Sequence, residues 1–267
     1  IEDGREVRPI EVAISRGEET GLVGASNMDY SRITARVAIV IDSGGPPSSV
    51  QDSSPYSYGY AIEVHGKSAH AGLEPEKGVP AISIAAEAVL GLPQGRIDFE
   101  TTGNVGLIHG GTVRNAVPDF CRVDGEMRSM EFEKVESLVS QAKDHLAEVR
   151  RRHPDARIDG DFSLGYPGYK LEPDDPAAKL LYGALRGMGM TPDPHPVGGG
   201  TDGNVFRGKG IASVVWTRAR PIGVSSSPTR MNITAIGSAS SGSGNARVIS
   251  TSMRNVALPG NSKRVSA

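Results

Sequence analysis

The order of hydrophobic patterns between residues 56 and 162 restricts the folds that this chain can adopt. Apolar patterns of the strand type predict strands at residues 58–64, 104–108, 121–127 and 156–162. Apolar residues at helical spacing predict one helix over 78–90 and a longer one along 135–149. The resulting order, strand–helix–strand–strand–helix–strand, is that of a ferredoxin-like α+β domain.

The flanking segments have a different organisation. Strand-like runs alternate there with helical patterns, which is typical of an α/β domain. We expect strands at 9–15, 37–41 and 212–216, helices at 22–29 and 176–188, and a Ser/Pro-rich connector from Pro46 to Pro55. The sequence therefore predicts an α/β domain that carries an inserted α+β domain. The predicted divisions are 1–55 and 164–220 for the α/β domain, 56–163 for the inserted domain, and 221–267 for a tail.

Charge and composition exclude several classes of protein. The 29 Lys and Arg residues nearly balance the 31 Asp and Glu residues, which argues against a nucleic-acid binder. A single Cys rules out an internal disulfide and favours a reducing compartment, and no apolar run is long enough to span a membrane. We therefore expect a cytoplasmic protein. Residues 221–267 contain no acidic or aromatic residue, and this composition predicts a disordered tail.

Carboxylates follow two of the predicted strands. Glu18 and Glu19 lie in a glycine-flanked turn, and Asp42 follows the apolar run 37–41. Sites in open α/β sheets form beyond the carboxyl ends of strands, and gathered carboxylates repel one another unless a cation holds them. One glutamate could then bind a metal while the other removes a proton from the water that the metal activates. The alternative is an exposed turn and a simple cap.

Polar loops of the inserted domain offer further candidates. His70 ends a loop of small residues and could donate a hydrogen bond to a developing oxyanion; the alternatives are a metal ligand or a surface histidine. Asn115 and Arg128 suit the backbone and the carboxylate of a peptide, although solvated loop polarity is an equal alternative.

Residues 198–203 formally match the G-x-G-x-x-G pattern of dinucleotide-binding loops. No clear strand precedes them within a strand–helix–strand unit, which argues against a dinucleotide site. A close approach of the backbone to a ligand or a metal site explains consecutive glycines at Gly198, Gly199 and Gly200 better.

Taken together and in order, these motifs resemble those of the aminoacylase/carboxypeptidase family of co-catalytic zinc peptidases. The matching segments are GEETGLVGA (17–25), IDSGG (41–45), GKSAHAG (66–72) with PEKG (75–78), GGT (110–112) with Asn115, GEMRS (125–129) and GGTDGN (199–204). The last segment resembles the peptidase T-like, or tripeptidase, branch. The resemblance implies a partial zinc-peptidase catalytic domain with an inserted ferredoxin-like lid and dimerisation domain.

The resemblance also implies roles for the metal site. Glu18 would be the general base, Glu19 would bind one zinc ion and Asp42 the other, with two zinc ions per complete site. The family's first metal motif, a His-x-Asp, and its last histidine ligand have no counterpart in this sequence. We therefore expect a chain shortened at the front and altered after about residue 216, with an incomplete metal site.

The remaining implied roles concern the substrate. His70 would polarise the scissile carbonyl or stabilise the oxyanion. It could do so in the active site of a second copy, in a homodimer formed by the lid. Asn115 and Arg128 would hold the backbone and terminal carboxylate of a small peptide, and Gly199 and Gly200 would line the pocket.

The resemblance thus predicts a peptidase that cleaves the N-terminal bond of short peptides with zinc-activated water. An inactive fragment, an aminoacylase or carboxypeptidase, and a non-catalytic dimerising or peptide-binding module are the alternatives. No nucleic acid or membrane partner is expected.

Overall fold

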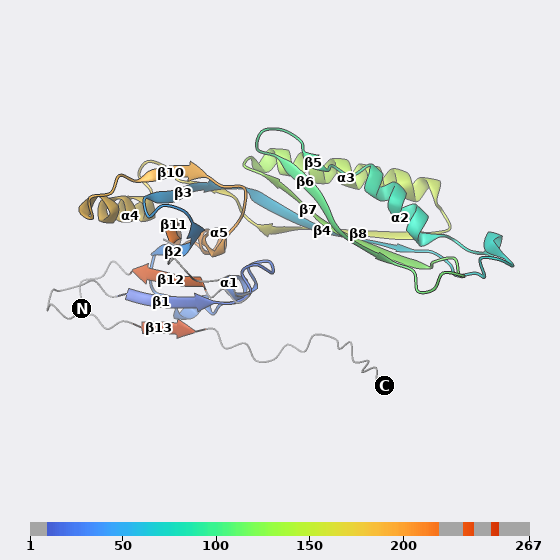
Figure 1. The fold of residues 1–267 in the computed structure, drawn as a ribbon, viewed down its shortest axis with the longest axis horizontal. Coiled ribbons are helices and arrows are strands. Elements are labelled where there is room, and N and C mark those ends of the chain that lie inside the picture. Colours follow the sequence, from blue (N-terminus) through green and yellow to red (C-terminus); the bar gives the residue numbers. More distant parts are fainter. Residues whose placement is uncertain (1–9, 219–231, 238–246, 251–267) are drawn as a thin grey trace.

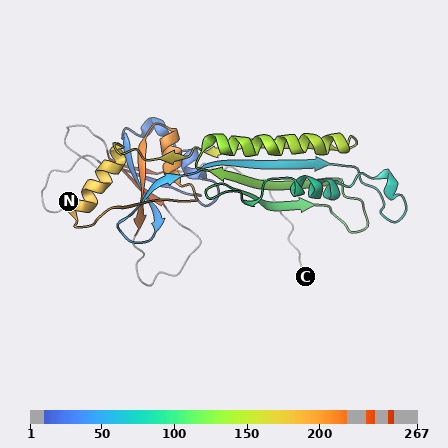
Figure 2. The same cartoon turned by 90° about the horizontal axis from the view of Figure 1, so that it is seen from above.

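The computed structural model describes residues 10–218, 232–237 and 247–250. Two β-sheets lie one after the other along the long axis of the molecule (Figure 1). The turned view in Figure 2 shows the same separation, with the long helix α3 (Phe132–Arg152) running beside the second sheet. In the described ranges, no helix combines the length and the apolar character that a membrane crossing requires.

The larger sheet has the order β10-β3-β11-β2-β12-β1-β13, with β9 paired to β3. β2 is parallel to β11 and antiparallel to β12, and β12 is antiparallel to β1, so β1 and β2 run in the same direction. Their carboxyl ends therefore meet at one edge of the sheet. The strands are β1 (Ile10–Ser15), β2 (Val37–Gly44), β3 (Ser49–Ser54), β9 (Tyr169–Lys170), β10 (Asp193–Pro196), β11 (Ala212–Arg218), β12 (Asn232–Gly237) and β13 (Arg247–Ser250).

Helices cover both faces of this sheet because its central strands are apolar on both sides. α4 (Pro176–Gly187) packs Leu181 and Leu185 against Val50 and Val214. On the other face, Phe206 of α5 (Asp202–Gly208) packs with Ala38, Val40 and Val215. The short helices α1 (Val23–Ser26) and η1 (Tyr30–Arg32) connect β1 to β2.

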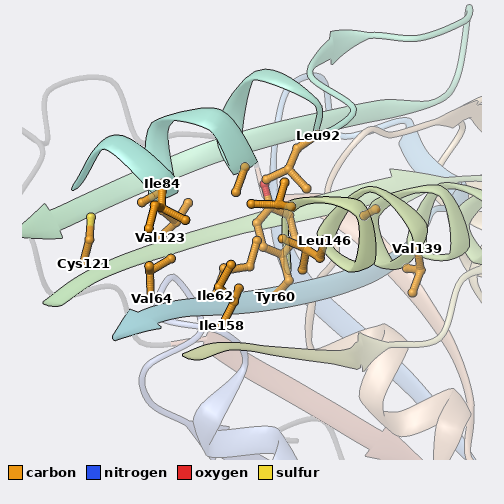
Figure 3. Close-up of a cluster of buried hydrophobic side chains, with 14 of the residues drawn as sticks. Tyr60, Ile62, Val64, Ile84, Leu92, Cys121, Val123, Val139, Leu146 and Ile158 are labelled. Atoms are coloured by element: carbon orange, nitrogen blue, oxygen red, sulfur yellow. The ribbon is translucent and has the colours of Figure 1, made fainter. Parts of the chain in front are cut away.

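The second sheet, with its two helices, forms the inserted domain (residues 56–166). Its order is β5-β6-β7-β4-β8, and α2 and α3 pack on one face (Figure 3). Ile62, Val64 and Val123 of the sheet meet Ile84 of α2 and Leu146 of α3 in a fully buried core. This arrangement confirms the predicted ferredoxin-like order. The elements are β4 (Tyr56–His65), η2 (Pro75–Lys77), α2 (Ala81–Leu90), β5 (Gly95–Arg96), β6 (Thr102–Gly110), β7 (Phe120–Ser129), α3 and β8 (Arg157–Tyr166).

The structure differs from the sequence-based expectation at two places in the larger sheet. The connector predicted from Pro46 to Pro55 contains β3, whose polar residues are buried between β10 and β11. Two segments of the predicted disordered tail, Asn232–Gly237 and Arg247–Ser250, are strands in the sheet. The remaining residues of 221–267 lie outside the described residues.

Candidate functional site

The predicted glutamate pair lies in a tight turn, here called the glutamate turn (residues 17–22). The backbone carbonyl of Glu18 accepts hydrogen bonds from the N–H groups of Gly21 (3.2 Å) and Leu22 (3.0 Å). Gly17 and Gly21 have positive φ angles of 71° and 95°, and Leu22 adopts the same left-handed region at 57°. Glycine enters this region without steric cost, which explains why the turn is flanked by glycines.

A close backbone contact fixes the glutamate turn against β1. A Cβ atom on Gly24 would lie 2.3 Å from the carbonyl oxygen of Arg16 and 2.6 Å from its nitrogen. The backbone of α1 is therefore in direct contact with Arg16, which follows the end of β1. Only glycine, which has no Cβ atom, fits at this contact. The position of Glu18 and Glu19 thus follows from the end of a rigid strand.

Asp42 lies near the end of β2, at the edge where β1 also ends. Strands β1 and β2 flank β12, so the two strand ends are about 10 Å apart at the usual spacing between neighbouring strands. The structure therefore brings the glutamate turn and Asp42 to the same edge of the sheet, as the sequence predicted.

Asp202 is a further carboxylate at this edge, and sequence reasoning did not assign it a role. It begins α5, is fully buried, and its Oδ2 accepts a hydrogen bond from the Ser15 hydroxyl at the end of β1. Burial raises the pKa of Asp202, the charge of Asp42 raises it further, and the Ser15 hydrogen bond opposes the rise. Its Oδ1 has no hydrogen-bond partner among the described residues. The GGTDGN motif was the signal that could have identified it.

Whether this edge of the sheet can hold a metal ion depends on the ligand atoms that its side chains offer. Carboxylate oxygens such as those of Glu19 and Asp42 do bind zinc, but a stable zinc site has at least three protein ligands. Within residues 10–218, 232–237 and 247–250, no group of three or more His, Cys, Asp or Glu side chains is placed to hold a metal ion. The described residues therefore do not form a complete metal site.

A second part of the predicted site lies where the inserted domain meets the larger sheet. Arg128, near the end of β7, donates from Nη1 to the carbonyl oxygen of Gly198 (3.0 Å) and from Nη2 to Glu126 (2.8 Å). Burial lowers the pKa of Arg128, but the hydrogen bond to Glu126 and the nearby charges of Tyr166 and Glu126 together outweigh burial, so the pKa is raised and the guanidinium stays charged. Residues 198–200, here called the glycine loop, are therefore held beside Arg128.

The glycine loop also contacts the last residue of the inserted domain. A Cβ atom on Gly200 would lie 2.2 Å from Cζ of Tyr166, so the tyrosine ring occupies the space that a side chain would need. Tyr166 in turn packs against the buried cluster of Leu22, Ala25 and Val205, which includes the last residue of the glutamate turn. The structure thus brings Arg128, Gly199 and Gly200 together, on the side of the inserted domain that faces the glutamate turn.

His70 and Asn115 lie elsewhere. His70 pairs with Ala116, and the carbonyl oxygen of Asn115 accepts a hydrogen bond from Ala71, so their two loops touch. They lie beyond the far end of the ten-residue strand β4 (light blue in Figure 1), which spans about 30 Å at the usual rise per residue. Within one chain, the structure brings these two residues together with each other and not with Glu18.

Comparison with known proteins identifies the class of the inserted domain. Residues 56–154 match the family described as the peptidase dimerisation domain. The chain is 38% identical over 213 residues to the uncharacterized protein YqjE of Bacillus subtilis, covering 80% of this chain and 57% of the relative. It is 28% identical over 198 residues to peptidase T of Vibrio cholerae, covering 73% of this chain and 47% of the relative.

Solved structures give the same result. Aminopeptidase PepT from Bacillus cereus superposes with a TM-score of 0.65 at 37% identity, covering 82% of this chain and 57% of that one. A tripeptidase from Staphylococcus aureus gives 0.66 at 29% identity, covering 76% and 54%. The predicted resemblance to this peptidase family and to its peptidase T-like branch is confirmed. The chain spans about half the length of the curated relatives it matches.

Proposed function

We propose that this chain is part of a metal-dependent peptidase that hydrolyses the N-terminal peptide bond of short peptides, tripeptides among them. The observation that carries the proposal is the meeting of the glutamate turn, Asp42 and the glycine loop around the buried Asp202, in a chain similar to peptidase T and to a solved tripeptidase. The same reasoning divides the chain into a catalytic domain at 1–55 and 164–220, to whose sheet the strands β12 and β13 also belong, and a lid at 56–163.

Each carboxylate has a proposed task. Glu18 acts as the general base, which takes a proton from the attacking water and passes it to the leaving amine. Glu19 and Asp42 supply part of the ligand set of a two-zinc centre, and further ligands come from outside the described residues. Bound zinc supplies Lewis-acid activation of the water.

Substrate contacts come from two directions. Arg128 pairs with the terminal carboxylate of the peptide, which a guanidinium can bind with two parallel hydrogen bonds, while Gly199 and Gly200 line the pocket. His70 and Asn115 lie too far from Glu18 within one chain, so we propose that a second copy supplies them in a homodimer. His70 then stabilises the oxyanion and Asn115 holds the peptide backbone.

The exposed edge of the inserted domain supports the dimer. On β6, Leu107 and Ile108 are 56% and 51% exposed, and a partly uncovered edge strand with apolar side chains favours pairing with another chain. We also propose a cytoplasmic location, which suits a chain with a single cysteine.

The test measures zinc by elemental analysis and cleavage of a tripeptide with a free or an acetylated amino terminus. We expect cleavage of the free form alone, and Glu18→Gln should keep the zinc content while turnover falls by at least about 100-fold. Glu133→Gln, on an exposed part of α3, is the control and should leave both unchanged. A chain that holds neither zinc nor activity would refute the proposal for this chain, and an active Glu18→Gln variant would refute the base assignment.

A further inference from the structure

Asn204 occupies an unusual place between the two halves of the molecule. It lies in the first turn of α5 and is fully buried. Its Oδ1 accepts a hydrogen bond from the backbone N–H of Thr201 (2.9 Å), and its Nδ2 donates to Ser54 Oγ (2.8 Å) and to the carbonyl oxygen of Pro167 (2.9 Å). One buried amide therefore uses both its donor hydrogens and its acceptor.

The partners of Asn204 belong to the two connections between the domains. The chain enters the inserted domain after Ser54, where β3 ends and β4 begins at Tyr56. It returns through Pro167, between the end of β8 and the start of β9. Asn204 thus holds the outgoing and the returning connection at the same point.

The same network reaches the glycine loop. Ser54 Oγ receives the hydrogen bond from Asn204 and donates its own hydrogen to the carbonyl oxygen of Gly199 (2.8 Å). The neighbouring glycines contact the inserted domain directly, Gly198 through Arg128 and Gly200 through Tyr166. The loop is therefore held from the connections on one side and from the end of the inserted domain on the other.

A satisfied buried amide in this place has a clear physical consequence. Breaking one of its hydrogen bonds leaves a buried donor or acceptor without a partner, which costs more than the hydrogen bond itself contributes. A rotation of the inserted domain that moves Ser54 or Pro167 must therefore break bonds to Asn204 or carry α5 and the glycine loop with it.

We propose that Asn204 is a positioning residue that couples the orientation of the inserted domain to the glycine loop. For the peptidase reaction the inference rests on the proposed function, because that function places the loop and Arg128 against the substrate. The coupling itself is a property of this chain and can be measured without a substrate.

Asn204→Asp separates the coupling from the helix cap. The two side chains have the same shape, and the aspartate still accepts the Thr201 hydrogen bond that belongs to the capping box of α5. The ionised carboxylate cannot donate to Pro167, where two oxygens would face each other at about the present distance. We expect backbone hydrogen exchange to become at least about tenfold faster in three segments together, residues 52–58, 165–171 and 198–201.

Two further variants distinguish coupling from a general loss of structure. Ser54→Ala removes the bonds to the outgoing connection and to Gly199, and should speed exchange in 52–58 and 198–201 while leaving 165–171 unchanged. Thr201→Ala removes the side-chain cap at the start of α5, including the hydrogen bond from Gly203, and should leave both connections unchanged. The proposal is overturned if Asn204→Asp affects α5 alone, if it speeds exchange equally in β2 and β11, or if Ser54→Ala behaves like Thr201→Ala.

Tripeptide cleavage gives the functional readout. We expect Asn204→Asp to raise KM by about tenfold with kcat within about twofold of the parent, because the loop and lid hold the substrate without touching the attacking water. A fall in kcat at unchanged KM would overturn the positioning role. If the parent chain has no activity, the proposed function fails for this chain, while the exchange pattern still decides whether Asn204 couples the two parts.

Discussion

Gly24 offers a direct test of how the glutamate turn is held in place. Gly24→Ala places a Cβ atom 2.3 Å from the carbonyl oxygen and 2.6 Å from the nitrogen of Arg16. Both are backbone atoms, so no flexible side chain can move away to relieve the contact. The chain must shift either α1 or the end of β1, and either shift displaces Glu18 and Glu19.

Two opposing effects set the size of the change. Alanine is favoured over glycine inside a helix by about 1 kcal/mol, which would stabilise α1 if space were available. Overpacking against rigid neighbours typically costs about 1–3 kcal/mol, and a double backbone contact well inside van der Waals distance belongs at the upper end. We therefore expect Gly24→Ala to lower the free energy of unfolding by about 2 kcal/mol.

Gly183 provides the matched control. It lies in the helix α4, and a Cβ atom there would meet nothing within 4 Å. The same substitution should therefore raise the free energy of unfolding by about 0.5–1 kcal/mol, the opposite sign. The two variants together isolate the close contact from the general preference of helices for alanine.

Urea unfolding followed by tryptophan fluorescence measures both variants. The single tryptophan, Trp216, lies in β11 and reports on the sheet that carries the glutamate turn. The midpoint should fall for Gly24→Ala and rise for Gly183→Ala at equal slope. If both variants shift the midpoint in the same direction by similar amounts, the close approach of α1 to Arg16 does not hold the turn, and the reasoning is refuted.

Two further variants test the buried acid and the core of the inserted domain. A raised pKa means that folded Asp202 holds its proton more tightly than the unfolded chain does, so the free energy of unfolding decreases as the pH rises from the ordinary value of 3.8 through the raised pKa. Asp202→Asn should therefore be more stable than the parent at pH 7, with a gain that shrinks towards pH 4 in urea titrations; an equal gain at both would contradict it. Leu146→Ala should cost about 2–5 kcal/mol because the side chain is 1% exposed, whereas Leu90→Ala, at 84% exposed, should change little when unfolding is followed by far-UV circular dichroism.

The inserted domain could be predicted from the sequence because its signals are local. In α3 the apolar residues Val135, Leu138 and Leu146 recur at helical spacing, and the structure buries that stripe. The strand β3 gave no such signal. Val50 is its only strongly apolar residue, and Gln51 and Ser53 are buried through pairing with strands that are distant in the sequence. Such pairing depends on the whole sheet and leaves no pattern in the segment itself.

The site shows the same division between local and distant information. The glutamate turn could be predicted because its glycines surround the acidic pair in the sequence. The contact of Asp202 with Ser15 joins residues that are far apart along the chain, and only the folded arrangement shows that this carboxylate is buried next to the charge of Asp42. Likewise, the sequence suggested that both Arg128 and His70 contact the substrate. In the structure the two residues lie at opposite ends of the sheet that contains β4 and β7.

Two of the three glycines that match a dinucleotide-binding motif, Gly200 and Gly203, are required by packing within the chain. The strand before them, β10, is a short strand at the end of the sheet, and α5 has only seven residues. Gly200 makes room for the ring of Tyr166, and a Cβ on Gly203 would lie 2.9 Å from Val215 of the neighbouring strand. Because Gly200 contacts Tyr166 of the inserted domain, a side chain at this position would displace the inserted domain relative to the larger sheet. That displacement would in turn move Arg128, which belongs to the inserted domain.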